Sequence, residues 1–197
     1  MIMNTQNKKF KISKERELNT YAEMWRVSYW TMHQAEKEVR GSYFQLMASL
    51  VFTAFTLEAY SNHLGKLIFT CWDNLERPFS PQTKMNLIAE KFKIVTDYNK
   101  RPFQTAKKLL KFRNDVAHGK SALLKVENEI ITSSDDIEKQ MDKPLEAEWE
   151  KYCTLKNAKQ AREDIEKIIK QFHKSSKTKE SLFFTGITSS STSLMNE

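Results

Sequence analysis

Glycine and proline are scarce in this chain. The 197 residues include 4 glycines and 4 prolines, well below the roughly 12% that the two residues make up in average proteins. A sandwich or barrel of many short strands needs frequent turns, and turns draw heavily on glycine and proline. The composition therefore argues against such an all-β fold. Hydrophobic residues make up 40% of the chain, which is enough for a core, and the length fits one domain.

Cysteine is nearly as scarce, and this limits the sites that the chain can build. Cys71 and Cys153 are too few for a disulfide framework, and without CxxC spacing they do not predict a structural zinc site. We therefore expect no bound metal and a reducing, cytoplasmic location. The chain also lacks a glycine-rich phosphate loop, so no nucleotide cofactor is expected.

Long apolar runs are also missing. The first residues lead into lysines rather than an apolar stretch, so we expect no signal peptide. The most apolar stretch, residues 43–57, is shorter than a membrane-spanning helix. We interpret it as a buried helix and expect no membrane partner.

Positive charge is present and concentrated. The net charge is +7, and the window 100–125 holds eight basic residues against one acidic residue, Asp115. Such a cluster attracts polyanions, most often nucleic acid or anionic lipid. The alternative is a solvated helix face that only keeps the protein soluble.

The periodicity predicts an all-α bundle of four to five helices. Apolar residues recur at helical spacing over 14–39 and 42–69, and the second of these helices is apolar enough to lie at the centre. Ser80 and Pro81 indicate a third helix that ends near residue 95, and a fourth runs from Pro102 to Gly119. A further helix follows Pro144 and runs to His173, with a possible break at 154–157.

The remaining segments are predicted to be irregular or short. Residues 121–132 suggest a short β-hairpin or an irregular insertion, followed by a polar loop over 133–143. The predicted domain organisation is a flexible N-terminus (1–13), one helical domain (14–174) and a mobile tail rich in Ser and Thr (175–197).

Unusual chemistry gathers at the end of the fourth helix, in Arg113-Asn114-xxx-His118. A histidine can transfer a proton near neutral pH, and the planar fork of Arg113 matches phosphate oxygens. Asn114 lies one turn before His118 and can orient a ring or a substrate. This set suffices to cleave a phosphodiester without a metal. Alternatively, His118 and Gly119 are an ordinary helix end, and Arg113 and His118 point about 140° apart on an ideal helix.

Two short stretches carry a resemblance to a known family. Residues 113–118 resemble the Arg-x(4–6)-His motif of the HEPN superfamily, and residues 55–62 (FTLEAYSN) are similar to the central-helix stretch of HEPN-like and abortive-infection-like proteins. The resemblance implies a small helical bundle that acts as a homodimer, with the motif helices meeting at the interface. It also implies a metal-independent endoribonuclease, acting as a toxin, in phage defence or in RNA processing.

The resemblance assigns roles to individual residues. His118 would act as general base or acid, Arg113 would stabilise the transition state, and Asn114 would orient the reacting groups. Gly119 and Lys120 follow His118, so the HxY extension of one toxin branch is absent, and its nucleotidyltransferase antitoxin is not implied for this chain. The partners that the resemblance implies are therefore a second copy of the chain and an antitoxin or defence-system protein of another kind. The basic residues expected to bind RNA are Lys107, Lys108, Lys111 and Lys120.

Glu58 is a carboxylate within the most apolar helix, where a buried charge needs a partner. It either pairs with Arg113 and supports it, or faces solvent or bonds to Asn62.

The alternatives to an enzyme are a non-catalytic module that binds RNA or protein, and a structural dimer.

Overall fold

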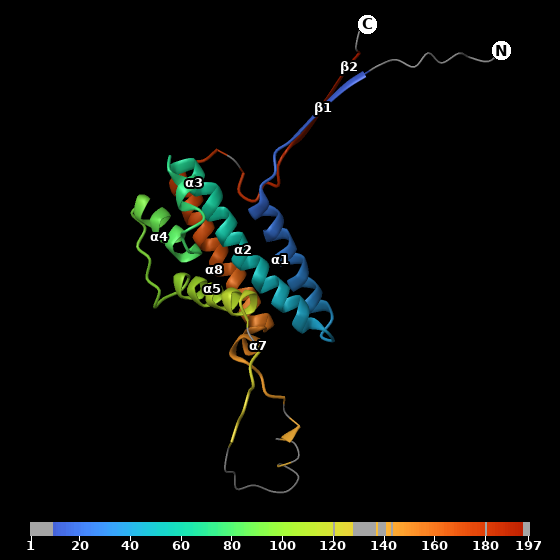
Figure 1. The fold of residues 1–197 in the computed structure, drawn as a ribbon, viewed down its shortest axis with the longest axis vertical. Coiled ribbons are helices and arrows are strands. Elements are labelled where there is room, and N and C mark those ends of the chain that lie inside the picture. The colour runs from blue at the N-terminus through green and yellow to red at the C-terminus, as the bar shows by residue number, and fades with distance from the viewer. Residues whose placement is uncertain are drawn as a thin grey trace, which may run out of the picture.

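The computed structural model describes residues 10–119, 121–127, 137, 141–142, 144–179 and 181–194. The protein is mostly helical (Figure 1). Its helices are α1 (Thr20–Lys37), α2 (Ser42–Ile68), α3 (Trp72–Leu75), α4 (Pro81–Lys91), α5 (Phe103–Ala117), α7 (Glu148–Tyr152) and α8 (Leu155–Ser176). Two strands, β1 (Phe10–Arg16) and β2 (Thr188–Leu194), complete the described elements.

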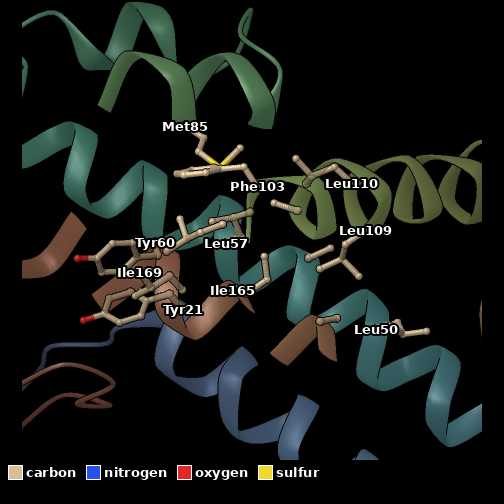
Figure 2. Close-up of a cluster of buried hydrophobic side chains, with 14 of the residues drawn as sticks. Tyr21, Leu50, Leu57, Tyr60, Met85, Phe103, Leu109, Leu110, Ile165 and Ile169 are labelled. Carbon is tan, nitrogen blue, oxygen red and sulfur yellow. The ribbon is translucent and has the colours of Figure 1, made fainter. Parts of the chain in front are cut away.

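Helix α2 lies at the centre of the bundle, as its composition predicts. It packs against α1, α4, α5 and α8, and Leu50, Leu57 and Leu64 on its inner face are almost fully buried. Figure 2 shows side chains from several helices meeting in this core, among them Tyr21, Met85, Leu109 and Ile165. The long apolar helix therefore organises the fold because it buries surface from most of its neighbours.

The predicted helix boundaries are mostly close to the observed ones. At the start of α4, Ser80 Oγ accepts a hydrogen bond from the Thr83 backbone N–H at 3.1 Å, and Pro81 occupies the first turn. The predicted break in the last helical segment lies at Cys153–Thr154, where the Thr154 hydroxyl caps α8. However, α4 ends at Lys91 rather than near residue 95, and the final segment begins at Glu148 rather than after Pro144.

The two ends of the chain differ from the prediction. The first helix begins at Thr20, not at residue 14, because residues 10–16 form β1 and pair antiparallel with β2. Phe10 lies opposite Leu194 and Arg16 opposite Thr188, and this ribbon extends away from the bundle (Figure 1). The backbone N–H and C=O groups of β1 that bond to β2 are therefore not free to form the hydrogen bonds of a longer α1. Residues 1–9 and 195–197 lie outside the described residues.

The segment that leads to β2 is also attached to the bundle. The Phe183 ring stacks on Trp25 with the ring centroids 4.8 Å apart. The Asn19 and Glu17 backbone N–H groups donate to the carbonyl oxygens of Thr185 and Ile187. The prediction of a mobile tail over 175–197 missed these contacts, since its Ser- and Thr-rich composition carries no sign of a partner near the start of the chain.

The region after α5 is described only in part. Residues 121–127 are exposed and irregular, which fits the predicted irregular insertion rather than a hairpin over these positions. Residues 128–136 lie outside the described part, and so do most of the positions of the predicted polar loop. The two-stranded ribbon thus joins the ends of the chain instead of following the fourth helix.

Candidate functional site

Helix α5 carries most of the predicted site, and a buried carboxylate holds its N-terminal end against α8. Arg101 donates two hydrogen bonds to Asp164, from Nε at 2.6 Å and from Nη2 at 2.9 Å. The Thr105 hydroxyl donates to the same carboxylate at 2.6 Å, and the Asp164 side chain is only 1% exposed. The hydrogen bond to Asp164 raises the pKa of Arg101 above its ordinary value. These contacts fix the position of α5 in the bundle.

Arg113 points from α5 towards the central helix. Its Nη2 donates to Glu58 Oε2 at 2.5 Å, and its guanidinium lies over the Phe55 ring, 5.7 Å from the centroid. The Arg113 and Glu58 side chains are 13% and 27% exposed. Of the two alternatives for Glu58, the structure therefore shows the ion pair with Arg113. Among the described residues, the partners of the Glu58 carboxylate are Arg113 and Lys84, and Asn62 is not one of them.

A third charged group in this cluster is one that sequence reasoning missed. Lys84 of α4 lies with Nζ 3.5 Å from Glu58 Oε1, and its side chain is only 4% exposed. The available signal was its position on the buried stripe of α4, next to Met85 and one turn before Ile88. A lysine on an apolar stripe requires a carboxylate partner, and Glu58 provides it.

His118 lies apart from this cluster. It is the C-cap of α5, its backbone N–H donates to the Asn114 carbonyl oxygen at 2.9 Å, and the residue is exposed. Gly119 follows because a Cβ there would lie 2.9 Å from the Asp115 carbonyl oxygen. No hydrogen bond or ion pair joins Arg113 to His118 in the described part of the chain. The structure thus brings Arg113 to Glu58 and leaves His118 in solvent, as the 140° helical offset implies.

The predicted RNA-binding lysines share one outer face of α5 with two cavities. The first cavity, of about 570 Å³, lies beside Tyr98 and Gln82 and is called the Tyr98 cavity here. The second, of about 260 Å³, lies beside Trp149 and Tyr152 and is called the Trp149 cavity. The other residues that line them are Gln104, Lys107, Lys108, Leu110, Lys111, Asn114 and Asp115 for the first, and Lys108, Lys111, Phe112, Asp115 and Glu148 for the second.

The cationic groups on this face are largely uncompensated. Lys111 Nζ lies 2.5 Å from Asp115 Oδ2. Within the described residues, Lys107 and Lys108 have no carboxylate within 4 Å. Exposed Asn114 lines the Tyr98 cavity, on the lysine face rather than beside Arg113. Lys120, the fourth predicted RNA-binding residue, lies outside the described residues.

A second buried cation went unpredicted. Arg162 of α8 donates to the Trp25 carbonyl oxygen at 3.0 Å and to the Ser28 hydroxyl at 2.8 Å, and its guanidinium lies 3.7 Å from the centroid of the Trp25 ring. Burial lowers the pKa of Arg162 to about 10. Because these contacts join α8 to α1 away from both cavities, they hold the fold together rather than form a reactive site.

The described residues hold no group of three or more His, Cys, Asp or Glu side chains that could bind a metal ion. Among the same residues, no helix combines the length and the apolar character needed to cross a membrane.

Fold and site together define a mostly helical protein with a buried Glu58–Arg113–Lys84 cluster and a cationic face on α5. Comparison of the chain with profiles of known protein families, with curated proteins and with solved structures finds no match.

Proposed function

We propose that the protein is a metal-independent endoribonuclease of the HEPN type. The observation that carries this proposal is the exposed His118 at the end of α5, one turn beyond Asn114 and on the helix that presents Lys107, Lys108 and Lys111. Cationic side chains along one helix hold a phosphate backbone, and an exposed imidazole beside them can transfer protons. The proposed location is the cytoplasm, and the proposed role lies in phage defence, toxicity or RNA processing.

The reaction needs only proton transfer and charge stabilisation. His118 removes the proton from a ribose 2′-hydroxyl, the 2′-oxygen attacks the adjacent phosphorus, and the bond to the 5′-oxygen breaks. The leaving 5′-oxygen takes a proton from a second imidazole, which leaves a 2′,3′-cyclic phosphate and a 5′-hydroxyl. Arg113 stabilises the negative charge that builds up on the phosphate oxygens.

One copy of the chain supplies a single His118, and its Arg113 points elsewhere. The proposal therefore includes a homodimer in which a two-fold axis brings two motifs to one cleft.

An outward stripe on α2 suits such an interface, because it is apolar and only partly covered: Phe44 is 68% exposed, and Val51, Phe52 and Phe55 are half-buried. Two antiparallel copies of α2 would pair Phe52 with Phe55 and Ala48 with Ala59, so that large side chains meet large ones and small meet small. The stripe also adjoins Arg113, which lies over Phe55.

Incubation of the purified protein with total RNA in EDTA tests the enzyme. We expect cleavage by the wild type and a loss of 10²- to 10⁴-fold in rate for His118→Ala, the usual contribution of general acid–base catalysis. His33→Ala is the matched control, since His33 is a partly exposed histidine of α1 that pairs with Glu36. Equal activity in wild type and His118→Ala, or a requirement for magnesium, would contradict the mechanism.

A second candidate, a non-catalytic RNA-binding module, is favoured by one observation. Arg113 is already bound to Glu58 at 2.5 Å and is mostly buried, so it is less available to a phosphate than an exposed arginine. Such a module needs the lysines of α5 but not His118. Wild-type protein that binds RNA, forms a dimer and cleaves no RNA tested would support this module instead.

A further inference from the structure

The two cavities on α5 are separated by a shared ridge. Lys108, Lys111 and Asp115 line both the Tyr98 cavity and the Trp149 cavity, so the same ammonium groups border each of them. The ridge follows the helical spacing, because residues 108, 111 and 115 lie one turn apart on one face. A ligand that spans the ridge would therefore enter both cavities and place its middle between the lysines.

The Tyr98 cavity offers a fixed aromatic ring and side-chain amides. The Tyr98 hydroxyl donates to Asn86 Oδ1 at 2.5 Å, and the ring packs edge-on against Phe103 with the centroids 6.1 Å apart. Gln82 and Gln104 also line the cavity. An aromatic surface with nearby amide donors and acceptors is suited to a nucleobase, which presents a flat ring and hydrogen-bonding edges. The volume of about 570 Å³ is within the range of small-molecule pockets, roughly 300–1,000 Å³.

The Trp149 cavity repeats this chemistry on the other side of the ridge. Trp149 and Tyr152 of α7 line it, and the Tyr152 ring packs against Phe112 with the centroids 5.3 Å apart. The Tyr152 hydroxyl, like that of any tyrosine, is neutral at physiological pH and does not repel a phosphate, and burial raises its pKa further, to about 12. Glu148 also borders this cavity, and Lys151 Nζ lies 2.8 Å from its Oε1.

The charge on the ridge favours an anion. Asp115 is paired with Lys111, which leaves the ammonium of Lys108 on the ridge and that of Lys107 beside it without a carboxylate among the described residues. A phosphate bound there meets cations, and the groups on either side of it meet aromatic rings. Single-stranded nucleic acid has this alternation of phosphate and base.

We infer that this face of α5 binds two consecutive nucleotides of single-stranded RNA, with their phosphate on the Lys108–Lys111 ridge and one base in each cavity. The inference rests on the RNA substrate of the proposed function and adds its subsites. It requires unpaired bases, because bases held in a duplex stack on each other and cannot enter separate cavities. The ridge would thus select loops and single strands for delivery to His118, which follows on the same helix.

Binding of 2′-O-methyl oligonucleotides to the full chain tests the inference. These strands lack the 2′-hydroxyl that the proposed reaction attacks, so affinity is measured whether or not the protein is a nuclease. We expect affinity to rise about tenfold or more from a mononucleotide to a dinucleotide, since a stacked base contributes on that order. We expect an abasic strand of equal length to bind at least tenfold more weakly than the strand with bases. Equal affinity for abasic and base-containing strands would overturn the inference, and so would equal affinity for one and two nucleotides.

Variants separate base binding from simple charge attraction. Trp149→Leu and Tyr98→Leu should each weaken binding of the base-containing strand about tenfold and leave the abasic strand unaffected. Thermal melts identify any variant that fails to fold, and the remaining variant then decides. Lys107→Glu with Lys108→Glu should weaken both strands, whereas Lys37→Glu with Lys174→Glu, an equal charge change on exposed lysines of α1 and α8, should have a much smaller effect. Equal effects of the two lysine pairs would show that only net charge matters and would contradict the ridge.

Discussion

Glu58 is a single carboxylate that serves two cations from different helices. Its Oε2 accepts from Arg113 of α5, and its Oε1 faces Lys84 of α4 at 3.5 Å. Lys84 is almost fully buried, so removal of its partner leaves an ammonium group that water cannot reach easily. The role of Glu58 in this structure is to hold α4 and α5 on α2.

Glu58→Ala should therefore lower the free energy of unfolding by about 3 kcal/mol, as for other broken buried ion pairs. Adding Lys84→Met should recover at least about 1 kcal/mol of this loss, because the stranded charge is then removed. Urea denaturation measures both values. Glu163→Ala is the control: Glu163 also pairs with a lysine and an arginine, but it is 56% exposed, so its removal should change the free energy of unfolding much less. Equal effects at Glu58 and Glu163 would contradict the buried cluster.

The two cysteines should differ strongly in reactivity. Burial raises the pKa of the Cys153 thiol to about 11, while Cys71 is exposed. Since the thiolate is the reactive form, a raised pKa leaves little of it at pH 8. Folded protein treated with a disulfide reagent at pH 8 should label Cys71 rapidly and Cys153 slowly, and labelling of Cys153 should accelerate as the pH rises towards 11. In urea both should react alike. Rapid labelling of folded Cys71→Ser protein at pH 8 would contradict this prediction.

Among the elements, α2 depends on one close contact near its C-terminal end. The Trp72 indole packs directly on Gly65, and a Cβ at Gly65 would overlap the indole ring. Trp72 is almost fully buried, so it has little room to move. Glycine is a poor helix former, and its presence here follows from this contact rather than from any need of the helix itself.

Gly65→Ala should therefore destabilise the protein by about 1–3 kcal/mol, the usual cost of overpacking. Helix propensity alone predicts the opposite sign, a gain of about 1 kcal/mol. A denaturant melt decides between the two. In a Trp72→Leu background the overlap is removed, and the same substitution should become neutral or stabilising. A stabilised single Gly65→Ala variant would show that Trp72 can shift at little cost.

Some features of α5 could be predicted from the sequence, and others could not. Its extent and its end at His118 and Gly119 follow from local spacing. The rule that buried charges are paired required a partner for Glu58, but the sequence left open whether that partner was Arg113. Lys84 and the two cavities were not predictable in the same way. They depend on how α4 and α7 pack against α5, and contacts between separate helices leave no periodic signal in the chain.

At the scale of the whole molecule, the proposed dimer makes a direct prediction. Light scattering at micromolar concentration should give twice the 23.2 kDa of one chain. Phe55→Glu should give a monomer, because it places a charge in the α2 stripe. Trp30→Glu is the control, since Trp30 is a 55% exposed aromatic residue of α1 outside that stripe, and it should leave the dimer intact. A monomeric wild type would overturn the composite site.

The sequence by itself determined most of the helices and the central place of α2. A helix is stabilised by contacts a few residues apart, and the residues of its apolar face recur about every 3.6 residues, so both leave a local pattern in the chain. Only the tertiary structure decided that residues 10–16 and 188–194 form a ribbon, that Glu58 contacts both Arg113 and Lys84, and that two cavities border the lysines of α5. These features join segments far apart in the chain, and strand pairing and cavity shape depend on which distant backbone and side-chain atoms the packing brings together.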